Sequence, residues 1–157
     1  MKVFLDTNIL IDLLKCRVPF VYDARKLVIA SEFMDLRLYA CAQSYADAYF
    51  VLCEIADKAA VKQALLATTE YIEVCNTFGS DVAKSLKSGW NDIEDYLITH
   101  SAKHMNADYL VTRDKEVLRK SPVNTLTPRQ FLTMMHDEYG LEYDEIDFDE
   151  LYEGDSI

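Results

Sequence analysis

The sequence has little glycine and proline, no closely spaced cysteines and no long apolar run, and each scarcity excludes a class of protein. Only four Gly and three Pro occur in 157 residues, which excludes collagen-like and Gly/Pro-rich disordered chains. The four cysteines form no C-x-x-C pair, so no zinc or redox motif is present and reduced thiols are expected. No apolar run approaches the roughly 18 residues of a membrane span. An acid also interrupts the apolar N-terminus, which is untypical of a signal peptide, so we expect a cytoplasmic protein without a membrane partner.

Positive charge is absent from the end of the chain. Residues 137–157 contain ten acids and no Lys or Arg, whereas the residues before them contain 17 acids and 16 bases. The net charge of −11 therefore belongs almost entirely to this last segment. A change of composition this sharp predicts a folded domain over residues 1–136 and an acidic C-terminal tail over residues 137–157.

Hydrophobic periodicity predicts strands that alternate with helices. Short buried strands are expected at 2–6, 36–42, 70–75, 108–112 and 123–126, and helices at 8–15, 20–33, 44–56, 58–68, 80–88, 92–105 and 128–138. Strands separated by helices are typical of a parallel sheet with right-handed crossovers. The fold class is therefore predicted to be α/β, with a single-domain parallel β-sheet flanked by helices on both faces.

Acidic residues follow three of the predicted strands. Asp6 ends the first strand, Asp114 follows the strand at 108–112, and Asp47 falls in the first turn of a helix if Ser44 is its N-cap. Taken alone, Asp6 and Asp114 are better explained as helix caps, and Asp47 is explained equally well as a partner of the helix dipole. In open parallel sheets, however, ligands bind beyond the carboxyl ends of the strands, where all three residues are predicted to lie.

The predicted helix at 92–105 adds two more acids. Asp92 and Asp95 are three residues apart, so their carboxylates would repel each other on one helix face unless a cation lies between them. No cluster of basic residues accompanies the five acids, and all-oxygen sites suit Mg²⁺ or Mn²⁺. Such sites activate water and bind phosphoryl groups. His100 and His104 lack the Glu of an H-E-x-x-H zinc motif, so packing is the better interpretation of both.

Four ordered segments carry a family resemblance: LDTNILIDLL, SYADAYFVL, DIEDYLITHSAKHMNADYLVTRD and NTLTPRQFL. Together they resemble the PIN-domain ribonucleases, especially the VapC-like toxins of toxin–antitoxin pairs, over about residues 1–135. The resemblance implies a three-layer α/β/α fold and an acidic cleft in which Mg²⁺ or Mn²⁺ supports hydrolysis of RNA phosphodiester bonds. It also implies a small antitoxin protein as a partner and a homodimer.

Roles for individual residues follow from this resemblance. Asp6, Asp47, Asp95 and Asp114 match the four catalytic acids, of which Asp6, Asp95 and Asp114 are expected to bind the metal. Thr7, Asn8, Asp92 and Thr112 are expected to support them. Asp47 stands where most relatives have Glu, and its shorter side chain predicts weaker ligation at that position.

The charge balance of the body predicts modest, salt-sensitive binding of an RNA substrate, since nucleic-acid binders usually carry a basic stripe. The candidate phosphate contacts are Lys15, Arg17, Lys103, Arg113 and Lys115. The acidic tail is interpreted either as a solvated extension or as a segment that competes with RNA for these bases. Two functional alternatives stay open: an RNA-processing nuclease that is not a toxin, and a catalytically weak PIN-like module that binds a metal or a partner.

Overall fold

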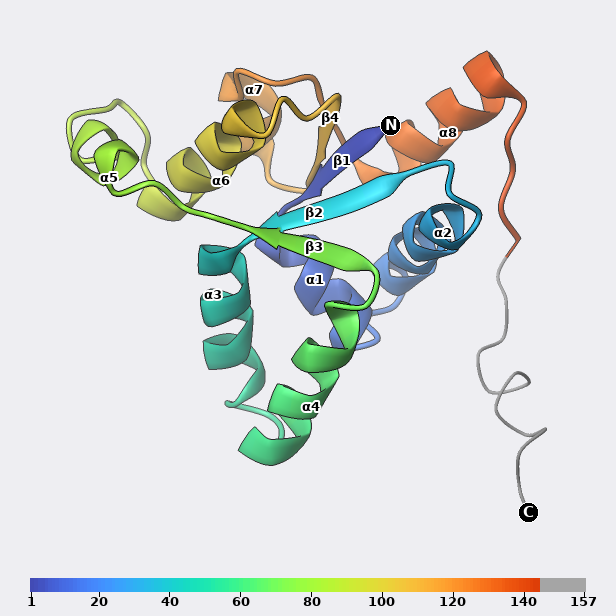
Figure 1. The fold of residues 1–157 in the computed structure, drawn as a ribbon, viewed down its shortest axis with the longest axis horizontal. Coiled ribbons are helices and arrows are strands. Elements are labelled where there is room, and N and C mark those ends of the chain that lie inside the picture. The colour runs from blue at the N-terminus through green and yellow to red at the C-terminus, as the bar shows by residue number, and fades with distance from the viewer. Residues whose placement is uncertain (145–157) are drawn as a thin grey trace.

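The computed structural model describes residues 1–144, and one five-stranded sheet lies at its centre (Figure 1). The strands are β1 (Lys2–Leu5), β2 (Arg37–Cys41), β3 (Ile72–Cys75), β4 (Tyr109–Val111) and β5 (Thr125–Leu126). Their spatial order is β3-β2-β1-β4-β5, and all four neighbouring pairs are parallel. The predicted α/β class with a parallel sheet is thereby confirmed.

Eight helices occur among the described residues: α1 (Thr7–Leu14), α2 (Phe20–Glu32), α3 (Ala42–Leu52), α4 (Lys58–Thr68), α5 (Gly79–Ser85), α6 (Ile93–His104), α7 (Lys115–Lys120) and α8 (Pro128–Tyr139). Helix α7 was not predicted, because its six residues are too few to show a helical period. Helix α3 begins two residues earlier than expected, with Cys41 rather than Ser44 as its N-cap. The predicted first-turn position of Asp47 was therefore wrong, and this residue lies in the second turn of α3.

The two faces of the sheet bury different side chains. Val3 and Leu5 of β1 join a cluster that includes buried residues of α1, α2, α3, α4 and α8. Phe4, between them, points to the other face and packs with Ile98 of α6 and Val117 of α7. Alternate residues of a strand point to opposite faces, so one short apolar strand supplies both cores. Figure 1 shows the resulting three layers.

The end of α8 bears on the predicted tail. Gly140 ends the helix in the left-handed conformation, with φ of 67°, which glycine adopts without a Cβ clash. After this turn Tyr143 is buried, and its hydroxyl donates a hydrogen bond to Asp35 (2.7 Å). The first residues of the predicted tail thus pack on the body. Residues 145–157 lie outside the described part of the chain, so the boundary at 136 and the role of the acidic segment stay predictions.

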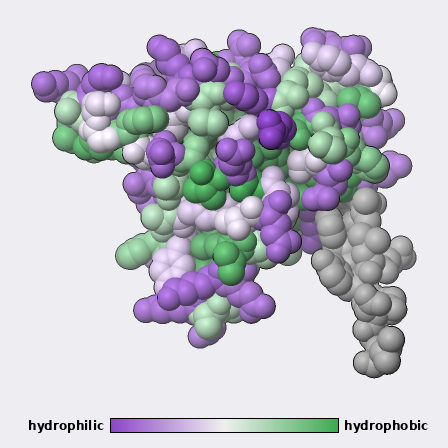
Figure 2. Space-filling model, viewed as in Figure 1, coloured by the Kyte–Doolittle hydropathy of each residue, from purple (hydrophilic) through white to green (hydrophobic). Residues whose placement is uncertain are grey.

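Exposed hydrophobic side chains occur in several regions of the surface, among them the end of α2, where Phe33 and Met34 are exposed. Phe78, Val82 and Leu86 are exposed around α5, and Phe50 and Leu66 are exposed on α3 and α4. Figure 2 shows that hydrophilic residues cover most of the upper part of the face in view. Within residues 1–144, no helix combines the length and the apolar character that a membrane crossing requires.

Candidate active site

Asp6 lies at the point where the sheet reverses its strand order. It joins the central strand β1 to α1, and its backbone N–H donates to the carbonyl oxygen of Val111 on the neighbouring strand β4 (3.1 Å). The chain passes from β1 to β2 on one side and later returns to β4 on the other. This switch point is the usual ligand position in an open α/β sheet. The side chain of Asp6 is nevertheless only 3% exposed.

Two polar side chains hold the Asp6 carboxylate. The amide Nδ2 of Asn8 donates to Oδ2 of Asp6 (2.5 Å) and to the hydroxyl of Thr112 (3.0 Å). The Thr112 hydroxyl donates a further hydrogen bond to the same Asp6 oxygen. The amide oxygen of Asn8 in turn accepts from the backbone N–H of Arg113 (3.2 Å). Residues that follow β1 and β4 are therefore joined in one network around Asp6.

Asp114 belongs to the same network. Its backbone N–H donates to the Thr112 hydroxyl (2.9 Å), and its side chain caps α7. Both capping bonds, from the backbone N–H groups of Glu116 (2.7 Å) and Val117 (2.9 Å), reach Oδ1. No hydrogen bond among the described residues reaches Oδ2. One carboxylate oxygen of Asp114 thus stabilises the helix, and the other is free for a ligand.

Asp92 and Asp95 begin α6. Asp92 is the N-cap and accepts a hydrogen bond from the backbone N–H of Glu94 (2.8 Å), while Asp95 lies in the first turn. The helix dipole favours acids at this end, which explains part of the composition here. Helix position alone does not explain why Asp95 also lies within electrostatic reach of Asp6 and Asp114.

Burial, together with neighbouring negative charges, raises the pKa values of Asp95 and Asp6. Burial and the neighbouring charges of Asp114 and Asp6 raise the pKa of Asp95 to about 7. Burial also raises the pKa of Asp6 to about 6, with a further contribution from Asp114, although the hydrogen bonds from Thr112 and Asn8 oppose this shift. Paired carboxylates with raised pKa values are typical of sites that bind cations or transfer protons.

Glu94 is an acid of this site that the sequence analysis missed. Burial raises its pKa, and the charges of Asp47, Asp6 and Asp92 add to the effect. The Thr7 hydroxyl is near enough to lower that pKa, although it makes no hydrogen bond of regular geometry. Asp47 faces the same group, and its carboxylate is held by the Gln43 amide (2.8 and 2.9 Å). The position of Glu94 beside Asp95 in a helical first turn was the available signal.

The predicted RNA-contacting cations lie in different environments. Lys15, Arg17, Lys103 and Lys115 are exposed. Arg113 instead donates two hydrogen bonds to Asp12 on α1 (2.6 and 2.8 Å), and its guanidinium carbon lies 3.9 Å from the centre of the Phe20 ring. The role of all five toward RNA stays a prediction, but Arg113 already has a structural role.

Replacing Arg113 by Met should lower the free energy of unfolding by about 3 kcal/mol, because Asp12 is only 1% exposed and would keep an uncompensated charge. Arg17→Gln is the matched control. Arg17 lies 4.0 Å from the same carboxylate but is 53% exposed, so its loss should cost about 0.5 kcal/mol. Urea denaturation measures both values, and equal effects would contradict the assignment.

The donor chemistry of the site suits a hard divalent cation. All candidate ligands are oxygens, and a cation would offset both the burial and the neighbouring negative charges that raise the pKa values of Asp6 and Asp95. Across residues 1–144, no three Asp, Glu, His or Cys side chains are arranged so that they could together hold one ion. The residues fit Mg²⁺ or Mn²⁺ by type and charge, but an ion here would need water to complete its ligands.

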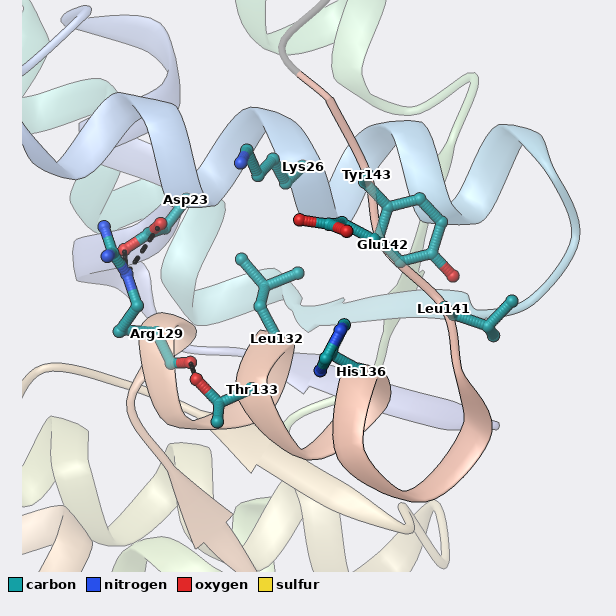
Figure 3. Close-up of a pocket in the computed structure, with 9 residues that line it drawn as sticks. All are labelled: Asp23, Lys26, Arg129, Leu132, Thr133, His136, Leu141, Glu142 and Tyr143. Atoms are coloured by element: carbon teal, nitrogen blue, oxygen red, sulfur yellow. Dashed lines mark hydrogen bonds and ion pairs between the residues drawn. The ribbon is translucent and has the colours of Figure 1, made fainter.

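A separate cavity of about 300 Å³ lies between α2, α8 and the segment after α8 (Figure 3). Arg129 pairs there with Asp23 (3.1 Å), and Glu142 and Tyr143 line the wall opposite α8. None of its lining residues belongs to the acidic site, by which we mean the group of Asp6, Asp47, Asp92, Glu94, Asp95 and Asp114.

Comparison with known proteins gives a family and a fold. The family model for the PIN domain matches residues 2–116, which is more than half of the chain. Among curated protein sequences none matches. The fold resembles that of VapBC2 from Rickettsia felis, solved bound to a DNA fragment from its promoter, with a TM-score of 0.61 and 18% identity over 81% of this chain and 98% of that one.

Two further solved structures show the same fold. VapBC-1 from nontypeable Haemophilus influenzae has a TM-score of 0.58 and 22% identity, over 82% of this chain and 99% of that chain. FitAcB from Neisseria gonorrhoeae has a TM-score of 0.58 and 16% identity, over 81% and 98%. At these identities the similarity establishes the fold of this chain.

Proposed function

Because the chain belongs to the PIN-domain family, a family of nucleases, we propose that it is a divalent-metal-dependent endoribonuclease. The observation that carries the proposal is that, at the switch point of the sheet, Asp114 and Asp6 lie near enough to Asp95 for their charges to add to the effect of burial in raising its pKa. These acids come from three separate parts of the chain. Each acid could cap or start its own helix without lying close to the other two, so helix capping alone does not explain their proximity.

Asp6, Asp95 and Asp114 would hold Mg²⁺ or Mn²⁺ partly through bridging waters, since the three carboxylates do not converge on one ion position. The ion would supply an acidified water and neutralise charge on the phosphoryl group. Asn8 and Thr112 keep Asp6 oriented and favour its ionised form through their hydrogen bonds. Asp47 and Asp92 lie near enough to Glu94 for their charges to raise its pKa. These three acids would orient water by accepting its protons in hydrogen bonds. The exposed Lys15, Arg17, Lys103 and Lys115 would contact substrate phosphates.

The direct test is cleavage of RNA by the whole protein. With Mg²⁺ or Mn²⁺ we expect internal cleavage that leaves a 5′-phosphate and a 3′-hydroxyl, with complete inhibition by EDTA. End-labelled RNA substrates and phosphatase treatment of the products distinguish these ends. Absence of cleavage under every divalent condition, or cleavage that survives EDTA, would contradict the proposal.

The solved structures that share the fold include VapBC and FitAcB complexes, which supports a toxin that is neutralised by an antitoxin. We propose this role for the chain, with a cytoplasmic site of action where RNA is present, and a homodimer as its assembled form. Induced expression should arrest growth, and co-expression of a small neighbouring reading frame should restore it. Unchanged growth, with intact cleavage in vitro, would favour an RNA-processing enzyme.

A further inference from the structure

A group of contacts outside the acidic site ties α7 to the loop before α6. The carboxylate of Glu116 accepts hydrogen bonds from the side-chain amide of Asn91 (3.1 and 3.2 Å) and from its backbone N–H (3.5 Å). Lys120, one turn further along α7, donates to the carbonyl oxygen of Gly89 (2.7 Å) and to Glu116. We call Gly89, Asn91, Glu116 and Lys120 the α7 clamp.

An aromatic ring strengthens the clamp. The Lys120 ammonium lies 5.4 Å from the centre of the Trp90 ring, within the range of a cation–π contact. Trp90 is partly buried against the core on this face and meets Tyr96 of α6 edge to face, with 6.2 Å between the ring centres. Lys120 is only 30% exposed, so its contacts are less screened than those of a typical surface lysine.

The clamp joins the two segments that carry repelling acids. Asn91 immediately precedes Asp92, the N-cap of α6, and Glu116 follows two residues after Asp114, the N-cap of α7. Among the charges that act on Asp95, that of Asp114 has the largest effect. Without a cation this repulsion would favour a larger separation between the starts of α6 and α7. The clamp opposes the movement, because its contacts bridge the same two segments.

We propose that Glu116 and Lys120 are positioning residues that set the separation between Asp95 and Asp114. The inference rests on the proposed function, since it concerns the acids assigned there to the metal. The clamp residues are not assigned as metal ligands; they act through Asn91 and α7. Without the clamp, Asp95 and Asp114 would lie further apart in the metal-free protein. The metal would then have to bring them together on binding, and its affinity would be lower.

The test compares the binding of Mn²⁺ alone to whole-chain variants. We expect Glu116→Ala and Lys120→Met to weaken Mn²⁺ about tenfold in calorimetry, as is typical when outer-shell partners are removed. Glu116→Gln keeps an acceptor for Asn91 and should restore affinity to within about twofold of the wild type. Arg129→Gln is the matched control, because it removes an ion pair that joins α8 to α2 away from the acids.

Two readouts separate positioning from simple stabilisation. A structural role would lower the unfolding midpoint equally with and without Mn²⁺, whereas a positioning role reduces the rise in midpoint that Mn²⁺ produces. Hydrogen exchange at the Asn91 amide, measured without metal, should be faster in Glu116→Ala. An unchanged exchange rate, or an unchanged Mn²⁺ affinity in a folded Glu116→Ala variant, overturns the inference. A wild type that binds no Mn²⁺ overturns the proposed function, and the clamp as a positioning device with it.

Discussion

Replacing Asp6 by Asn is expected to lower RNA cleavage by at least about 100-fold while making the metal-free protein more stable. The carboxylate is buried, and burial disfavours its ionised form, as its pKa of about 6 shows. An amide of the same shape keeps an oxygen for the donors Asn8 and Thr112 but carries no charge to bind a cation. Activity and stability should therefore change in opposite directions, as expected for a functional site.

The experiment measures initial rates of RNA cleavage and urea denaturation on the same preparations. Asp23→Asn is the matched control, because Asp23 is an acid in the first turn of α2 and pairs with Arg129 outside the acidic site. It should keep full cleavage activity and lose only a few tenths of a kcal/mol in stability. Equal cleavage by the wild type and Asp6→Asn would remove Asp6 from the catalytic group. Loss of stability in Asp6→Asn would leave a folding defect as the explanation.

The position of the candidate site could be predicted from sequence because it depends on where the strands end. Asp6 and Asp114 each follow a short apolar run, and parallel strands bring such positions to one edge of a sheet. No long-range contact had to be guessed for this inference. The strand order, with β1 between β2 and β4, then places both residues at the switch point.

The parts that could not be predicted depend on local geometry or on non-local packing. Helix α3 begins directly from β2, with no polar N-cap to mark its start, so Asp47 was placed one turn too early. The partner of Arg113 is Asp12, 101 residues away along the chain, and no periodicity reports such a pair. Helix α7 has only six residues, too few to show a helical period, although Asp114 was already a candidate cap for a helix at that point.

The pH dependence of stability provides a test that needs no substrate. Between about pH 4 and pH 7 the folded protein keeps protons on Asp95 and Asp6, whose pKa values are about 7 and 6, while the unfolded chain has lost them. The unfolded state then binds fewer protons, so the free energy of unfolding should fall as the pH rises through this interval. Under the proposed function, Mg²⁺ would bind the ionised acids and should reverse the trend.

Asp95→Asn should flatten this fall and raise the free energy of unfolding at pH 8 without metal by about 1–2 kcal/mol. That value is below what the full pKa shift would give, because Asp95 is only half-buried. Urea denaturation in EDTA from pH 4.5 to pH 8 measures the effect, and Asp23→Asn should follow the wild type throughout. Parallel curves for Asp95→Asn and the wild type would mean that Asp95 ionises like a solvated carboxylate. In that case the charges of Asp6 and Asp114 do not reach Asp95, and a bound cation would have no repulsion between these acids to relieve.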